Sequence, residues 1–365
     1  MSIFDTTKNP AICVLPWVHE FRTIGGKTAP CCQGDALQEN ETLNSIRTQM
    51  LQGIQPRACN KCYVKEKEST WSPRIQETVD WLKKFGEPDL DNPKLQYVDV
   101  RFDPTCNLKC KMCGPASSTL WQKEKKVSMP VNPNNLSYLN QVDKKTLKKV
   151  YLAGGEPTYI KGYLLFLEQL YDANPNCEVV INTNLKKLPE HWRRIIKKFK
   201  NLTIVCSCDS IETLGTYVRY PLVWQEFEDN VKFVSENANF LQFTLVASNL
   251  TSHKLFETCE WMKKYSNNIN LAILTGPDFF TERAIPHAIR DVYIDNISKL
   301  QNFPVSVHYA INFRNKIKYL LDKYNNSVYD ESLHRSLQHE IAEQDSHRSL
   351  QIKDVDHFLY DWIYR

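Results

Sequence analysis

Three cysteines lie close together shortly after residue 100. Cys106, Cys110 and Cys113 are separated by three residues and then by two. Soft thiolates at this spacing suit either zinc or an iron–sulfur cluster. A structural zinc site takes four ligands, whereas this segment supplies three. A cubane cluster held by three cysteines leaves one iron open to another molecule, so the spacing favours an iron–sulfur cluster.

A glycine-rich turn follows the apolar segment 149–154. Its residues are Gly154, Gly155, Glu156 and Pro157. Glycines let backbone carbonyls approach a cation closely, and a carboxylate pairs with an ammonium group. The turn can therefore present oxygen atoms to a cation. The alternative is an ordinary strand-to-helix turn in which Glu156 stands in the first turn of the helix.

Polar residues also end two later apolar segments. Ser207 and Asp209 close the segment 202–208, and Asn249 follows 240–248. Alternation along a strand puts Ser207 and Asp209 on one face and Cys206 and Cys208 on the other. If the polar pair faces the interior of a barrel, both cysteines face the helices. Helix capping or turn formation explains all three polar residues equally well.

From residue 95 the chain alternates between short apolar runs and segments of helical periodicity. The apolar runs are 97–102, 149–154, 178–183, 202–208, 240–248 and 269–274, and helices are expected at 163–172, 190–199 and 254–265. This alternation predicts parallel strands joined by right-handed crossovers. About 180 residues for six units indicates an α/β fold, a partial (β/α)6 TIM-like barrel rather than a complete eight-unit one.

The pattern divides the chain into four parts. Residues 1–75 form a cysteine-rich module, in which we expect a hairpin about Gly25–Gly26 and a helix near 43–51. Glycine and prolines then mark the end of a linker or bracing helix at 76–94. The barrel occupies 95–285, and a helical C-terminal extension occupies 286–365.

The order of these motifs resembles the radical SAM superfamily over roughly residues 95–280. The shared features are the CxxxCxxC loop after the first strand, the GGEP turn after the second, and polar residues at later strand ends. The resemblance implies that Cys106, Cys110 and Cys113 hold a catalytic [4Fe–4S] cluster. It also implies that S-adenosyl-L-methionine is bound by the residues Gly154, Gly155, Glu156, Pro157, Ser207, Asp209 and Asn249. The family usually has an aromatic residue before the third cysteine, near the adenine; here Met112 stands there, and methionine can fill the same apolar place.

The resemblance also implies a reaction. Reductive cleavage of S-adenosylmethionine would give a 5′-deoxyadenosyl radical that abstracts hydrogen from a substrate. The electron would come from a donor such as flavodoxin or ferredoxin. A peptide or protein is the first expectation for the substrate and a small metabolite the second. Asp99 and Arg101 alternate with apolar residues on the first strand, and they are either substrate contacts in the barrel interior or a structural ion pair.

Five cysteines precede the barrel: Cys13, Cys31, Cys32, Cys59 and Cys62. Their pattern resembles the auxiliary-cluster modules called SPASM or, in the one-cluster form, twitch, although these modules usually follow the barrel. Five cysteines suit one second, auxiliary iron–sulfur cluster. Cys13, Cys59 and Cys62 are the expected ligands, joined by Cys31 or Cys32. Zinc is the alternative, because two cysteine pairs at this spacing also describe a zinc ribbon.

The overall composition narrows the classes of partner. No apolar stretch approaches the roughly 20 residues of a membrane span, and the N-terminus lacks the pattern of a secretory signal, so we expect a cytoplasmic protein without a membrane partner. A net charge of +4 does not demand a polyanion. The basic run 193–200 reads as a helix with a solvated face, which argues against a nucleic-acid partner. A non-catalytic zinc-binding scaffold and an RNA-modifying radical SAM enzyme are the alternative functions.

Overall fold

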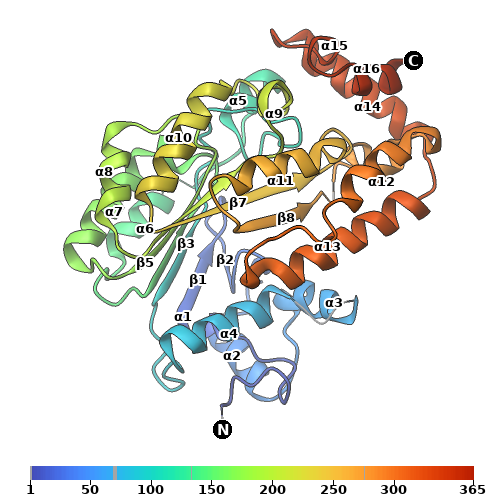
Figure 1. The fold of residues 1–365 in the computed structure, drawn as a ribbon. Coiled ribbons are helices and arrows are strands. Elements are labelled where there is room, and N and C mark those ends of the chain that lie inside the picture. The colour runs from blue at the N-terminus through green and yellow to red at the C-terminus, as the bar shows by residue number, and fades with distance from the viewer. Residues whose placement is uncertain (1, 69–71, 133, 275) are drawn as a thin grey trace. The chain divides into compact units, whose positions relative to one another are not determined.

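The computed structural model describes residues 2–68, 72–132, 134–274 and 276–365 (Figure 1). The chain divides into two compact units. Unit 1 comprises Met1–Pro104, Met129–Ile181 and Lys198–Leu202, and unit 2 comprises Thr105–Ser128, Asn182–Lys197 and Thr203–Arg365. The cysteine loop therefore belongs to unit 2, whereas the cysteine-rich N-terminal segment and the GGEP turn belong to unit 1.

Unit 1 contains a mostly parallel set of strands. They are β1 (His19–Arg22), β2 (Thr28–Ala29), β3 (Tyr97–Val100), β4 (Lys149–Leu152) and β5 (Glu178–Thr183), in the order β2-β1-β3-β4-β5. The expected hairpin is confirmed: β1 and β2 pair antiparallel, and Gly26 takes a φ of 81° in their turn. Strand β1 also pairs parallel with β3, with His19 opposite Tyr97. The hairpin was expected, but the pairing of β1 with β3 was not, because the β1 sequence HEFR has no apolar run.

Short helices surround the first strands. They are α1 (Leu15–Val18), α2 (Leu43–Leu51), α3 (Asn60–Glu68) and α4 (Pro73–Phe85). Helix α2 has the expected bounds and begins with a capping box between Thr42 and Ser45. Helix α4 begins where the Ser72 hydroxyl accepts a hydrogen bond from the backbone N–H of Ile75. All four residues of α1 are buried in an apolar core beside Trp81 of α4.

The strand–helix alternation continues along the barrel segment. Its helices are α5 (Thr119–Lys125), α6 (Asn135–Gln141), α7 (Lys161–Ala173), α8 (Glu190–Lys198), α9 (Glu212–Val218), α10 (Trp224–Asn237) and α11 (Leu255–Lys263). The strands β6 (Leu202–Ser207), β7 (Phe240–Ala247) and β8 (Ile269–Ile273) run parallel in that order. Alternate residues of β7 are buried, and Phe243 packs edge-on against Trp261 of α11 with ring centroids 5.8 Å apart. The predicted fold class, an α/β partial barrel, is confirmed.

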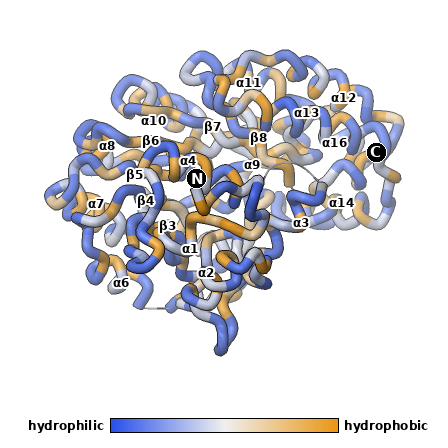
Figure 2. Tube along the Cα trace, turned by 90° about the horizontal axis from the view of Figure 1, so that it is seen from below, coloured by the Kyte–Doolittle hydropathy of each residue, from blue (hydrophilic) through white to orange (hydrophobic). Residues whose placement is uncertain are grey.

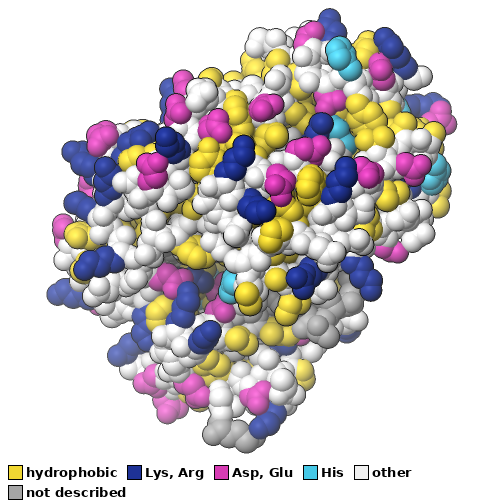
Figure 3. Space-filling model, viewed as in Figure 1, with side chains coloured by type: hydrophobic (Ala, Val, Ile, Leu, Met, Phe, Trp, Pro, Cys, Tyr) yellow, Lys and Arg dark blue, Asp and Glu magenta, His cyan; other side chains and the backbone are white. Residues whose placement is uncertain are grey.

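Helix α8 carries the basic run. Trp192, Ile195 and Ile196 are buried, whereas Arg194, Lys197 and Lys198 lie on the more exposed side. The expected amphipathic helix with a solvated basic face is therefore confirmed. On the face shown in Figure 3, Lys and Arg side chains are interspersed with Asp and Glu.

Residues beyond 285 are mainly helical, as predicted. The helices are α12 (Arg290–Ser298), α13 (Val307–Asn326), α14 (Glu331–Ser346), α15 (Ile352–Val355) and α16 (His357–Tyr364). Helix α13 packs on β8, and α14 begins at the capping carboxylate of Asp330. Hydrophobic and hydrophilic residues alternate along these helices (Figure 2). Among the described helices, none combines the length and apolar character that a membrane span requires.

Candidate active site

The cysteine loop of unit 2 is held to the segment after α9 by two backbone hydrogen bonds. Lys109 donates its N–H to the carbonyl of Tyr220 at 2.7 Å, and Lys111 donates to the carbonyl of Val218 at 2.8 Å. An irregular loop needs such partners because its own backbone groups are not paired in a helix or a sheet. The positions of the three cysteines are thus fixed by a neighbouring segment.

The three cysteines differ in exposure: Cys106 is half-buried, Cys110 is buried and Cys113 is exposed. The thiol of Cys113 donates a hydrogen bond to the sulfur of Cys110, which lowers the pKa of Cys110 although burial opposes its ionisation. The nearby cation of Arg219 lowers the pKa of Cys110 further. The same hydrogen bond, together with burial, raises the pKa of Cys113 well above its ordinary value. The pair therefore favours one thiolate, at Cys110, which is the form of cysteine that binds a metal.

The cation is Arg219, which our sequence reasoning missed. Its Nη1 donates to Oδ2 of Asp209 at 2.7 Å, and Oδ1 of Asp209 accepts the backbone N–H of Val246 at 3.0 Å. The Nε of Arg219 has no hydrogen-bond partner within the described residues. Burial acts to lower the pKa of Arg219, but Cys110 and Asp209 raise it well above its ordinary value. Arg219 belongs to no sequence motif, so its place beside Cys110 was recognised only from its ion pair with Asp209 in the structure.

Two asparagines near the end of β5 were also missed. Asn184 places its Nδ2 3.9 Å from the sulfur of Cys106 and 2.8 Å from Oδ1 of Asn107. Asn182 accepts a hydrogen bond of 3.1 Å from the hydroxyl of Ser207. The available signal was their position, because polar residues that follow a parallel strand gather at the active-site edge.

The other predicted residues of unit 2 lie as follows. Asn249 is fully buried and donates to the carbonyls of Phe279 and Thr281 at 2.8 and 3.1 Å. Its Oδ1 has no partner in the described part of the chain. Met112 is half-buried. Cys208 is buried close to Cys259 of α11, which agrees with our expectation that it faces a helix.

The GGEP turn of unit 1 has the backbone that its glycines allow. Gly154 takes a φ of 113°, and a Cβ there would lie 3.0 Å from the carbonyl oxygen of Asp103. Gly155 donates its N–H to that same carbonyl at 2.9 Å. Glu156 is buried and accepts hydrogen bonds from the N–H and hydroxyl of Thr158 at 3.1 and 2.6 Å. Its carboxylate therefore caps the following 3-10 turn, Pro157–Tyr159, whereas our alternative interpretation placed Glu156 within the first turn of a helix.

Asp99 and Arg101 form an ion pair in the same unit. Both carboxylate oxygens of the buried Asp99 accept hydrogen bonds from Arg101, at 2.7 and 3.0 Å. The guanidinium lies 4.9 Å from the ring centroid of Tyr151, and the Arg101 side chain is 33% exposed. Arg101 is therefore a partly exposed cation, and its backbone lies next to Gly154.

The N-terminal cysteines separate into a group of four and one outlier. Burial raises the pKa of Cys13 and of Cys31, and nearby cysteines raise both further: Cys59 and Cys62 act on Cys13, and Cys13 and Cys62 are among those that act on Cys31. Burial is the main cause that raises the pKa of Cys59, to about 12. The thiol of Cys32 instead bonds to Asp99. This arrangement favours Cys31 over Cys32 as the fourth member of the group.

The loop cysteines and the N-terminal cysteines are of the residue type that binds iron–sulfur clusters and zinc, although their side chains do not converge on one point. Among the described residues, no three His, Cys, Asp or Glu side chains meet as the ligands of one metal ion. A cubane distributes its cysteines over separate irons, so the loop need not gather three sulfurs around one point. All twelve cysteines lie in the described ranges, and no disulfide joins any two of them.

Comparison with known proteins agrees with the motif. The family model described as "Radical SAM superfamily" matches residues 100–212, which include the cysteine loop, the GGEP turn, Ser207 and Asp209. The chain carries a radical SAM domain. The resemblance deduced from the motifs is thereby confirmed. The chain is 31% identical over 103 residues to GTP 3′,8-cyclase of Helicobacter pylori (strain ATCC 700392 / 26695), a match that covers 27% of this chain and 32% of the cyclase. The chain thus spans about a third of the relatives that it matches.

Two solved structures with bound S-adenosylmethionine resemble this chain loosely. The structure of native anSMEcpe with bound AdoMet gives a TM-score of 0.40 at 15% identity and covers 60% of this chain and 62% of anSMEcpe. Streptococcus suis SuiB bound to S-adenosylmethionine gives a TM-score of 0.39 at 16% identity, covering 78% of this chain and 69% of SuiB.

Proposed function

We propose that this protein is a radical SAM enzyme whose [4Fe–4S] cluster is held by Cys106, Cys110 and Cys113. The observation that carries the proposal is the paired arrangement of Cys110 and Cys113 beside the buried cation Arg219, within a domain that matches the superfamily. The bound cluster and S-adenosylmethionine would together supply a 5′-deoxyadenosyl radical for hydrogen abstraction. An external reductant such as flavodoxin or ferredoxin would supply the electron, and a reducing compartment such as the cytoplasm suits the disulfide-free cysteines.

The chain's own residues have distinct parts in this proposal. The carbonyls and carboxylate of Gly154, Gly155 and Glu156, followed by Pro157, would bind the amino group of S-adenosylmethionine. Asp209 orients Arg219 through its 2.7 Å ion pair, and the Nε that it leaves without a partner is available to an anionic group such as the methionine carboxylate. Met112, Ser207 and Asn249 would complete the contacts. Arg101 would face the substrate, because its side chain keeps 33% of its surface exposed, and the buried Asp99 would hold it in place.

For the N-terminal segment we propose an auxiliary metal centre on Cys13, Cys31, Cys59 and Cys62. Four thiols suit a second [4Fe–4S] cluster or zinc equally well. Arg74 is buried beside this group, and its attraction partly offsets the burial that raises the pKa of Cys13. A fixed cation of this kind offsets the negative charge of several thiolates, whichever metal they hold.

The test is anaerobic purification followed by metal and product analysis. We expect iron and acid-labile sulfide in the wild-type protein, and 5′-deoxyadenosine after reduction with S-adenosylmethionine. Zinc alone, with no iron and no 5′-deoxyadenosine, would instead support the scaffold function. Substituting serine for both Cys13 and Cys59 should remove the N-terminal metal and leave the loop cluster in place. The metal content of this variant therefore distinguishes the two centres.

The substrate requires a separate experiment. The cysteine-rich module favours a peptide or protein. The local identity to GTP 3′,8-cyclase makes a nucleotide the best candidate among small metabolites. Mass spectrometry of cell extracts with and without the gene distinguishes a modified peptide from a modified nucleotide. An RNA substrate would show itself by binding that weakens steeply with salt.

A further inference from the structure

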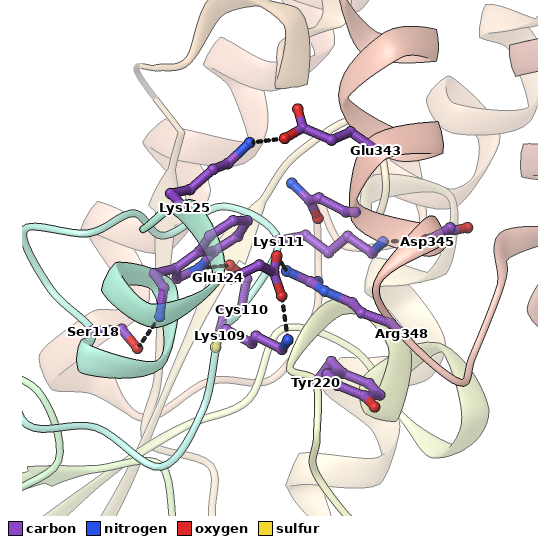
Figure 4. Close-up of polar contacts among 12 residues, drawn as sticks. Lys109, Cys110, Lys111, Ser118, Glu124, Lys125, Tyr220, Glu343, Asp345 and Arg348 are labelled. Carbon is purple, nitrogen blue, oxygen red and sulfur yellow. Dashed lines mark hydrogen bonds and ion pairs between the residues drawn. The ribbon is translucent and has the colours of Figure 1, made fainter. Parts of the chain in front are cut away.

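The C-terminal extension contacts the cysteine loop through buried charges within unit 2 (Figure 4). Lys111 stands between the second and third loop cysteines, and its side chain is fully buried. Its Nζ lies 2.5 Å from Oδ1 of Asp345, a residue in the last turn of α14 and 234 positions further along the chain. A buried ammonium needs such a partner, because its charge has lost the solvation of water.

Asp345 is held in place from three sides. Besides Lys111, it accepts a hydrogen bond of 3.0 Å from the hydroxyl of Tyr217 and one of 2.8 Å from the backbone N–H of Ile352. The Nζ of Lys111 also lies 3.9 Å from the ring centroid of Tyr217, within range of a cation–π interaction. The network thus joins the loop to α9 and to both ends of the α14–α15 connection.

A second network reaches the loop at Cys110. Glu124 of α5 accepts hydrogen bonds from Lys109 and, at 3.1 Å, from Nη2 of Arg348. The fully buried guanidinium of Arg348 lies 4.9 Å from the ring centroid of Trp121. Trp121 in turn donates its indole N–H to the carbonyl of Cys110 at 2.9 Å. Arg348 therefore supports the tryptophan that fixes the backbone of a proposed cluster ligand.

The two networks leave an excess of positive charge at the loop. Three cations, Lys109, Lys111 and Arg348, face two carboxylates, Glu124 and Asp345. Two guanidinium nitrogens of Arg348, Nε and Nη1, have no hydrogen-bond partner among the described residues. In Figure 4 the Arg348 side chain points toward the loop that carries Cys110. A nearby cation favours the reduced form of an iron–sulfur cluster, because reduction adds negative charge.

We propose that the C-terminal extension contributes to the cluster site by positioning the cysteine loop and by adding positive charge. Asp345 positions the loop by holding Lys111. Arg348 positions Cys110 through Trp121 and adds a cation that raises the reduction potential of the cluster. The effect on potential rests on the proposed function, whereas the positioning of the loop holds in the metal-free protein as well.

Positioning is tested first without metal, by hydrogen exchange at the amides of residues 106–113 in the full chain. Asp345→Asn removes the charge that holds Lys111. The matched control is Glu343→Gln on the same helix, which breaks an ion pair of 2.7 Å with Lys125 at a carboxylate that is 38% exposed. We expect about tenfold faster exchange at the loop in Asp345→Asn and wild-type exchange in the control. Equal exchange in the two variants overturns the positioning role.

The charge effect is tested after anaerobic reconstitution. Arg348→Gln removes the cation, whereas Arg348→Lys keeps it. We expect a more negative midpoint potential and an altered electron paramagnetic resonance spectrum for Arg348→Gln, with the wild-type potential retained by Arg348→Lys. Equal potentials in both variants, shifted or not, contradict the proposal. If the wild-type protein binds no iron, the proposed function fails, and the exchange experiment still decides the positioning role.

Discussion

The ion pair between Asp209 and Arg219 offers the sharpest test of the loop environment. The side chains are only 5% and 9% exposed, and their closest atoms lie 2.7 Å apart. We consider Asp209→Asn, in which an amide of nearly the same shape replaces the carboxylate. The amide oxygen can still accept the N–H of Val246, which lies 3.0 Å from Oδ1 in the wild-type protein. The substitution therefore removes the counter-charge of Arg219 and little else.

The expected loss of folding stability follows from the burial of the ion pair. Removing one partner of a buried ion pair destabilises a protein by about 3–5 kcal/mol, because the other charge stays buried without compensation. Solvent screening does not reduce this figure here, since neither side chain is more than 9% exposed. A loss of about 3 kcal/mol lowers the ratio of folded to unfolded protein by about two orders of magnitude. The amide would also place an N–H donor against the guanidinium, so Arg219 should turn away from Cys110 and Cys113.

The assay is equilibrium urea unfolding of the metal-free protein, with Asp295→Asn as the control. Asp295 forms a surface pair with Lys299 at 2.6 Å, with side chains 68% and 47% exposed. That variant should lose less than about 1 kcal/mol. A parallel titration with S-adenosylmethionine should show weaker binding to reconstituted Asp209→Asn. If Asp209→Asn is no less stable than the control, Arg219 is not held as the structure indicates, and the reasoning fails.

Two further substitutions test the N-terminal group and the GGEP turn, and one treatment tests the metal itself. Cys31→Ser should lower the metal bound by residues 1–75, whereas Cys32→Ser should leave it unchanged; metal analysis of the purified variants decides, and the reverse result would make Cys32 the ligand. Gly154→Ala should weaken S-adenosylmethionine binding at least about tenfold, because its Cβ would meet the Asp103 carbonyl at 3.0 Å, and calorimetric titration measures this. Removing metal with a chelator should lower the thermal stability of the cysteine-rich segment; an unchanged melting curve would argue against a structural metal there.

Much of the fold was predictable because its strands are apolar over most of their length. Strand β5 has the predicted bounds, and β7 ends one residue before its predicted end. Strand β1 was not predictable in this way. It contains His19 and Glu20, and its place in the parallel sheet comes from pairing with β3, in which Tyr97 lies opposite His19. Pairing between distant segments is a tertiary property, so a local pattern of apolar residues does not report it.

The candidate site likewise has a part that the sequence predicted and a part that it did not. The cysteines of the loop, and the glycines of the turn, were predicted because metal ligation and a positive φ restrict residue type and local spacing. Whether Cys31 or Cys32 belongs to the N-terminal group was not predictable, because adjacent residues have almost the same spacing to the other cysteines. The structure separates them through their surroundings, since Cys32 contacts Asp99 instead.

The charges around the cysteine loop show why the sequence predicted the candidate cluster ligands but not the residues that position them. A buried lysine or arginine must find a counter-charge, but that partner can come from any part of the chain that the fold brings near. Lys111 finds Asp345, 234 residues later, and Arg348 finds Glu124, 224 residues earlier. Local spacing therefore predicts the candidate cluster ligands, whereas the groups that position those residues and set the charge around them become visible only in the folded chain. The radical chemistry that we propose depends on both sets, because a cluster with the right ligands and the wrong potential would not accept its electron.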